Sequence, residues 1–104
     1  MIVQFNTDKT INGDEKSSAY FTGLIEDGLK RFSSQITRIE VHLSDENGKK
    51  EGPRDIRCLM EARLEGRKPI AISSNEGTEE QAISEAIERL RTSIETTLEK
   101  ASDH

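Results

Sequence analysis

Two side chains could carry catalytic chemistry: His42, which can exchange a proton near neutral pH, and Cys58, whose thiolate would be a nucleophile. His42 lies in a stretch where polar and apolar residues alternate, and Glu40 falls on the same side of that stretch. A histidine beside a carboxylate can act as a general base, although an exposed strand histidine has the same pattern. Cys58 alternates in step with Ile56 and Met60, which predicts a buried apolar cysteine instead of a nucleophile.

Other motifs of enzymes and cofactor sites are missing from the sequence. Its seven glycines are dispersed and form neither a dinucleotide-binding nor a phosphate-binding loop. One cysteine and two histidines are too few for an ordinary structural zinc site. The acidic pair Glu79-Glu80 fits the first turn of a helix, where the helix dipole favours negative charge. We therefore predict a protein that is not an enzyme, with no cofactor and no metal.

Length and composition predict one small domain spanning residues 1–104. Apolar residues make up 32% of the chain and charged residues 34%, with a net charge of −5, so the core must be thin. The sequence has no apolar run near the ~20 residues of a membrane span, and it starts without the basic and apolar regions of a signal peptide. We expect a cytoplasmic protein that does not bind a membrane.

The spacing of apolar residues separates four predicted strands from two predicted helices. Period-two alternation is typical of half-buried strands, and a stripe at spacings of three and four is typical of an amphipathic helix. A capping box, Thr78-Glu79-Glu80-Gln81, precedes the second helix, and Asp14 is the expected cap of the first. The expected elements are strand 1–6, helix 15–32, strands 37–44, 54–64 and 69–74, and helix 79–100.

This β-α-β-β-β-α order predicts an α+β fold, a two-layer sandwich with a four-stranded, mostly antiparallel sheet and both helices on one face. The first strand pairs parallel to the second because a helix connects them, and the last three strands form an antiparallel meander. The other face of the sheet is then open to solvent or to a partner. The residues expected on the open face are Gln4, Arg38, Glu40, His42, Arg57, Glu61 and Arg63.

Three places in the sequence are similar to the ribosome hibernation promoting factor family, which includes the ribosome-associated inhibitor protein. The first helix ends in Leu29-Lys30-Arg31-Phe32 and leads through a short link into an alternating strand. A glycine-containing hairpin, Glu65-Gly66, joins the third and fourth strands. The last helix carries an Ala-Ile-x-x-Ala-x-x-x-Leu pattern from Ala82 to Leu90. The resemblance extends from Ile2 to about Lys100.

The resemblance implies a non-catalytic factor that binds the small ribosomal subunit, through 16S rRNA and not DNA, and inhibits translation in idle or stressed cells. Basic side chains would contact rRNA phosphates. Arg31 and Arg89 match the family's basic positions, and Lys30 and Arg91 lie beside them. Each has a structural alternative, because Arg31 suits a helix C-terminus and Arg89 is spaced to pair with Glu85.

The charges of the last helix support an alternative function. Its acidic residues outnumber its basic ones six to three, and an acidic helix repels rRNA phosphates. The same fold would then be a protein-binding or self-associating module that has lost rRNA binding, with a protein partner on the open sheet face or at an exposed strand edge. Cations clustered on one surface favour the ribosomal interpretation, whereas scattered, ion-paired cations favour the alternative.

Overall fold

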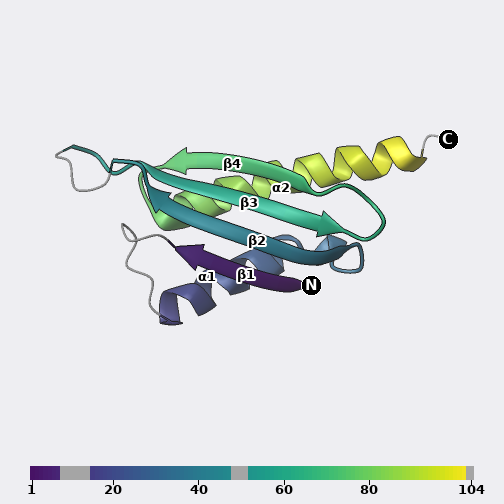
Figure 1. The fold of residues 1–104 in the computed structure, drawn as a ribbon, viewed down its shortest axis with the longest axis horizontal. Coiled ribbons are helices and arrows are strands. Elements are labelled where there is room, and N and C mark those ends of the chain that lie inside the picture. Colours follow the sequence, from purple (N-terminus) through teal and green to yellow (C-terminus); the bar gives the residue numbers. More distant parts are fainter. Residues whose placement is uncertain (8–14, 48–51, 103–104) are drawn as a thin grey trace.

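The structure, a computed structural model, describes residues 1–7, 15–47 and 52–102. Its order of elements confirms the predicted β-α-β-β-β-α fold (Figure 1). The sheet order is β1-β2-β3-β4, with β1 parallel to β2 and the other neighbours antiparallel. The elements are β1 (Ile2–Thr7), α1 (Glu15–Gly28), the 3-10 helix η1 (Lys30–Phe32), β2 (Ile36–Asp45), β3 (Ile56–Leu64), β4 (Ile70–Glu76) and α2 (Glu79–Ser102).

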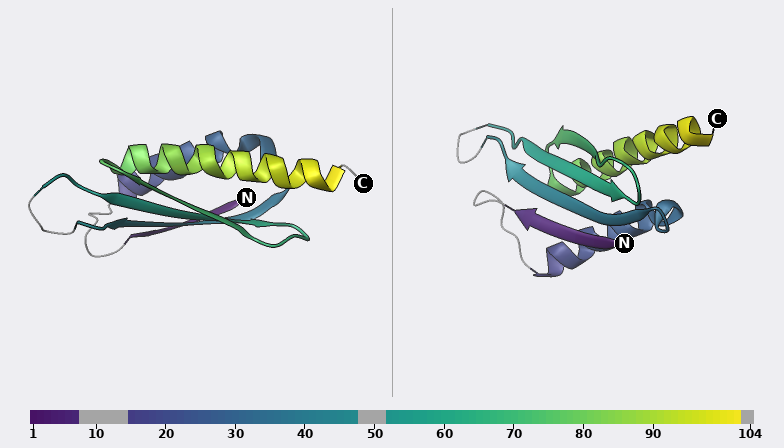
Figure 2. Two further views of the ribbon diagram at one scale, coloured as in Figure 1. Left: turned by 90° about the horizontal axis from the view of Figure 1, so that it is seen from above. Right: turned by 45° about the vertical axis from the view of Figure 1, so that its right-hand side comes forward.

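Both helices cover one face of the sheet, as predicted, and the opposite face is open (Figure 2). The molecule is elongated, with extents of 52 × 24 × 18 Å, and α2 runs along the long axis. No helix in the described ranges is long and apolar enough to cross a membrane.

The core fills the space between the helices and the covered face of the sheet. The α2 stripe predicted from the sequence is buried from Ala82 to Ile94, with Leu98 half-buried at its end. The covered face contributes alternate residues of β2 and β3, and the predicted strand positions of Cys58 and Met60 are fully buried. Among the described residues, Ser74 is the buried polar side chain of this core: its hydroxyl donates a hydrogen bond of 2.5 Å to the carbonyl of Ala82 and so joins β4 to α2.

The first helix is shorter than predicted. The α-helix ends at Gly28, four residues before the predicted end at Phe32, because the backbone of Leu29 leaves the helical conformation (φ −112°, ψ 11°). Lys30–Phe32 continue as a 3-10 turn, in which the amide of Phe32 donates to the carbonyl of Leu29 at 2.9 Å. The tighter turn keeps both Leu29 and Phe32 in the core.

The predicted caps have different outcomes. Thr78 caps α2 as expected, since its hydroxyl accepts a hydrogen bond of 3.1 Å from the amide of Gln81. Asp14, the predicted cap of α1, lies outside the described residues. The third strand starts at Ile56, two residues after its predicted start, because its ladder with β2 ends at the pair Asp45 and Ile56.

Candidate functional site

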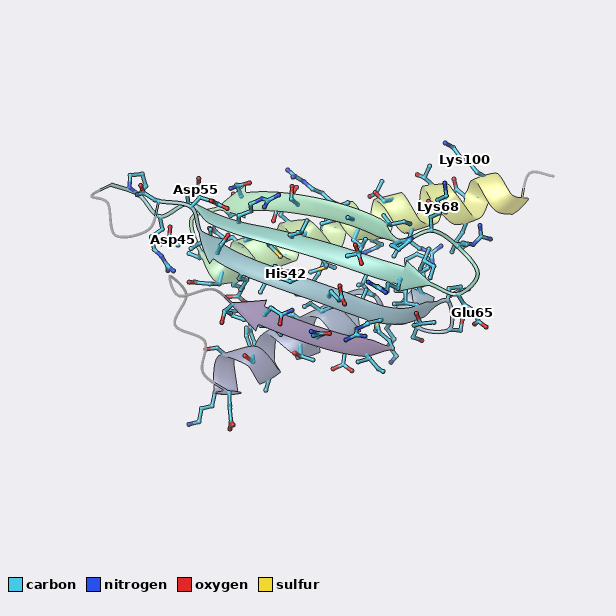
Figure 3. The ribbon with its side chains drawn as sticks, viewed as in Figure 1. His42, Asp45, Asp55, Glu65, Lys68 and Lys100 are labelled. Carbon is cyan, nitrogen blue, oxygen red and sulfur yellow. The ribbon has the colours of Figure 1, made fainter. Side chains whose placement is uncertain are left out.

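The two candidate catalytic residues lie on opposite faces of the sheet. Cys58 faces the helices and is fully buried, and this burial raises the pKa of its thiol to about 12. His42 is exposed on the open face (Figure 3), where its cross-strand neighbours are Asn6 and Leu59. A pair that shared a reaction would need to lie on one surface, so the two residues form no joint site.

The open face carries the predicted polar residues in ordered rows. Arg38 lies directly opposite Arg63 across β2 and β3, and the next row pairs Glu40 with Glu61. Ion pairs join the two rows: Arg38 to Glu40 at 3.5 Å, Arg63 to Glu61 at 3.3 Å and Arg63 to Glu40 at 3.9 Å. Arg38 also donates to the side-chain oxygen of Gln4 on β1. The rows of Arg38, Glu40, Glu61 and Arg63 therefore compensate each other's charges, whereas Arg57, also exposed on this face, has no ion pair with other described residues.

Lys30 and Arg31 lie on η1 and point outward. The Arg31 guanidinium binds the Glu95 carboxylate of α2 at 3.0 Å and lies 5.2 Å from the centre of the Phe32 ring, yet 73% of its side chain is exposed. Lys30 is exposed and has no ion pair within the described ranges. It lines a shallow hollow together with Asp27 of α1. The Arg31 guanidinium thus remains accessible to a further anion.

Arg89 and Arg91 lie on opposite flanks of α2. Arg91 binds Glu88 at 2.6 Å, lines the hollow between α1 and α2, and has a buried Nε atom without a hydrogen-bond partner. Arg89 turns toward β4: its Nε donates to Glu85 at 3.1 Å and its Nη1 donates to the carbonyl of Ser73 at 2.6 Å. The structure thus groups Arg91 with the η1 cations on the α1 flank and leaves Arg89 apart.

A group of cations that the sequence reasoning did not select lies at one end of the molecule. This end, called the hairpin end below, contains the chain start, η1, the β3–β4 hairpin and the end of α2. Figure 3 shows Lys68 and Lys100 here and Asp45 and Asp55 at the other end. The hairpin-end cations are Lys30, Arg31, Arg38, Arg63, Arg67, Lys68 and Lys100.

Charge is divided unevenly along the long axis. Counting with the hairpin end the last turn of α1 and the carboxylates that bind Arg38 and Arg63, its described residues comprise seven cations and seven carboxylates, whereas the rest of the described chain has five cations and nine carboxylates. In addition, the side chains of Arg67, Lys68 and Lys100 form no ion pair or hydrogen bond with other described residues. The sequence signal was the adjacent pair Arg67-Lys68 after Glu65-Gly66, but only the fold joins this hairpin to the link after η1, where the amide of Glu65 donates to the carbonyl of Gln35 at 2.9 Å.

The opposite end of the molecule, called the acidic end, contains Asp45, Asp55 and the first turns of α1 and α2 (Figure 1, Figure 3), and donors such as Arg54 and Tyr20 hold it together. Arg54 binds Glu79 through both carboxylate oxygens and Asp45 at 3.7 Å; the hydrogen bond to Glu79 is the main cause that raises the Arg54 pKa. Tyr20 of α1 donates to Glu80 of α2, and this bond raises the Tyr20 pKa. These contacts connect α1, α2 and β2 and leave a surface that repels phosphates.

Two solved structures have the same fold. The N-terminal domain of Protein Y from Thermus thermophilus aligns with a TM-score of 0.74 at 16% identity, covering 93% of this chain and 99% of that one. A ribosomal subunit interface protein from Coxiella burnetii aligns with a TM-score of 0.72 at 13% identity, covering 93% of this chain and 97% of that one. No family model and no curated protein match the sequence. The predicted resemblance to the hibernation factors is thus confirmed in the fold.

Proposed function

We propose that the chain is a cytoplasmic, non-catalytic, ribosome-associated factor that binds the small subunit through 16S rRNA and inhibits translation in idle or stressed cells. The observation that carries this proposal is the fold, which 93% of the chain shares with a ribosomal subunit interface protein and with the Protein Y domain. The position of Cys58 and His42 on opposite faces supports a non-catalytic role.

The hairpin end is the surface that we assign to rRNA. Protein affinity for a nucleic acid backbone comes mainly from cations that replace the counterions of phosphates. Lys30, Arg67, Lys68 and Lys100 are not neutralised by a described carboxylate. A local cationic surface can act despite the net charge of −5, because charges farther than the Debye length of about 8 Å are screened.

The three candidate arginines differ in what binding would require of them. Exposed ion pairs contribute only about 0–1 kcal/mol, so Arg31 can leave Glu95 for a phosphate at small cost. Arg91 lies in the hollow between the helices, and Arg89 is held by Glu85 and by the backbone of β4. We therefore rank Arg31 with Lys30 as the first contacts and place Arg89 and Arg91 second.

Co-sedimentation with isolated small subunits tests the proposal. Binding through several phosphates predicts that affinity falls about a hundredfold or more between about 50 and 200 mM salt. Reversing the charge of two hairpin-end cations, in the double variant Arg67→Glu/Lys68→Glu or in Lys30→Glu/Arg31→Glu, should abolish pelleting. Lys16→Glu is the matched control, because Lys16 is an exposed cation in the first turn of α1, at the acidic end.

Each outcome has one meaning. Salt-sensitive pelleting that the double variants lose and Lys16→Glu keeps would support both the function and the surface. Pelleting that every variant retains would contradict the surface, and pelleting of no form at low salt would contradict the function. Circular dichroism of each variant shows whether the helices persist.

A further inference from the structure

The β4 edge of the sheet has none of the usual protection in its own sequence. β4 has β3 on one side and none of the described strands on the other. Residues 70–75, Ile-Ala-Ile-Ser-Ser-Asn, carry no charge, and Pro69 lies before the strand instead of within it. An exposed edge offers unpaired backbone groups to any extended chain, and natural proteins usually block such an edge with charged residues or proline.

α2 supplies the missing charge. The Nη1 of Arg89 donates to the carbonyl of Ser73, in the middle of β4, at 2.6 Å, and the Nε of Arg89 is fixed by Glu85 one turn earlier at 3.1 Å. α2 lies over one face of the sheet (Figure 2), so Arg89 bonds to the edge strand from a helix that packs on that face. The contact occupies a backbone acceptor of β4 and brings a positive charge to it.

We propose that the β4 edge is a strand-addition surface for a second copy of this chain and that Arg89 is the latch that closes it in the monomer. An incoming strand would lie where the guanidinium lies, so Arg89 must release Ser73 before the two sheets can join. This assigns Arg89 a structural role in controlling assembly, separate from any contact with rRNA.

The charges at the two ends of β4 favour a second copy as the occupant. In an antiparallel pair of β4 strands from two copies centred on Ile72, Glu76 ends the strand of one copy, and Lys68 lies just before the start of the strand in the other, beyond Pro69. The side chain of Lys68 would then reach Glu76 of the other copy from outside the paired segment, so one pairing would form two Lys–Glu ion pairs. Neither Lys68 nor Glu76 has an ion pair within the described ranges of the monomer. Between them the facing residues are uncharged, which removes the like-charge repulsion that usually opposes edge pairing.

Sedimentation velocity over a wide range of protein concentration measures the dimer dissociation constant and so tests the role of Arg89. Arg89→Met removes the guanidinium and keeps the length of the side chain, and we expect it to lower the dimer dissociation constant about tenfold, the equivalent of about 1.4 kcal/mol. Arg89→Gln should have the same effect without adding apolar surface. Arg91→Met is the matched control, because Arg91 lies on the other flank of α2 and bonds to Glu88.

A charge swap identifies the surface. In the Arg89→Met background, Lys68→Glu places like charges opposite each other and should return the chain to a monomer, and adding Glu76→Lys should restore the dimer. Arg89 variants that remain as monomeric as Arg91→Met would overturn the latch. A dimer whose dissociation constant does not change in the charge-swap variants would overturn the β4 edge as its surface.

Discussion

The two faces of the sheet are built from the same strands and have opposite chemistry. In the ladder between β2 and β3, Leu43 lies opposite Cys58 on the covered face, and the next row, His42 opposite Leu59, lies on the open face. One row of the ladder therefore separates a fully buried thiol on β3 from an exposed imidazole on β2. The comparison shows that residues adjacent in the register can be separated by the thickness of the sheet.

The two faces therefore also differ in how much each contributes to the stability of the fold. The covered face excludes water, so its contribution grows with the apolar area that it buries. The open face can hold Arg38 beside Arg63 and Glu40 beside Glu61 because the rows neutralise each other in water. We expect large losses of stability from the first face and small ones from the second.

Truncating two adjacent residues of β3 tests this comparison with the largest expected change in stability. Met60 is fully buried against the helices, and Leu59 is half-buried on the open face. Met60→Ala should lower the free energy of unfolding by about 2–5 kcal/mol, since it removes buried contacts and leaves a cavity. Leu59→Ala should cost less than half as much. Urea unfolding measures both, and equal losses would mean that another surface covers the open face.

Two glycines of α1 extend the comparison of packed and open surfaces to the helices. A Cβ on Gly28 would lie 2.6 Å from the Cγ2 of Ile87 in α2, whereas a Cβ on Gly23 would meet no atom within 4 Å. Ile87 is buried and β-branched, so it cannot turn away easily. Gly28→Ala should destabilise the protein by about 1–3 kcal/mol, and Gly23→Ala should stabilise it by about 0.4–1 kcal/mol.

Thermal unfolding of the two glycine variants measures the sign and the size of each change in stability. If both variants were stabilised, α1 would not lie against α2 as closely as the structure shows. The unsubstituted chain is the reference, and the helical circular dichroism signal should be the same in all three.

The sequence allowed the fold to be predicted because its periodicity and its packing agree. The stripe from Ala82 to Ile94 and the alternation around Cys58 each have one face that must be buried, and together they leave a single two-layer arrangement. The end of α1 was predicted wrongly because Leu29 and Phe32 also fit a helical spacing. The 3-10 turn that places both in the core depends on tertiary contacts.

Prediction of the candidate site was less complete because it depends on distant pairs. The pairing of Arg89 with Glu85 follows from helical spacing and is confirmed, but its bond to Ser73 joins α2 to β4 and has no local signal. Arg31 and Glu95 lie 64 residues apart. Whether a cation is free or paired is therefore a property of the fold, and the roles of Lys30, Arg31, Arg89 and Arg91 in RNA binding stay predictions.

The thiol of Cys58 gives the smallest expected effect and a direct measure of how well the covered face excludes water. Burial raises its pKa from 9.0 to about 12, so between these values the thiol ionises in the unfolded chain but not in the folded one. Stability is therefore retained below about pH 9 and falls as the pH rises toward 12. Relative to Cys58→Ala, the unsubstituted chain should lose about 1 kcal/mol between about pH 8 and 9.5. Other titrating groups cancel in this difference, which urea unfolding under reducing conditions measures. A difference that does not change with pH would mean that the thiol ionises in the folded protein and that water reaches the face beneath the helices.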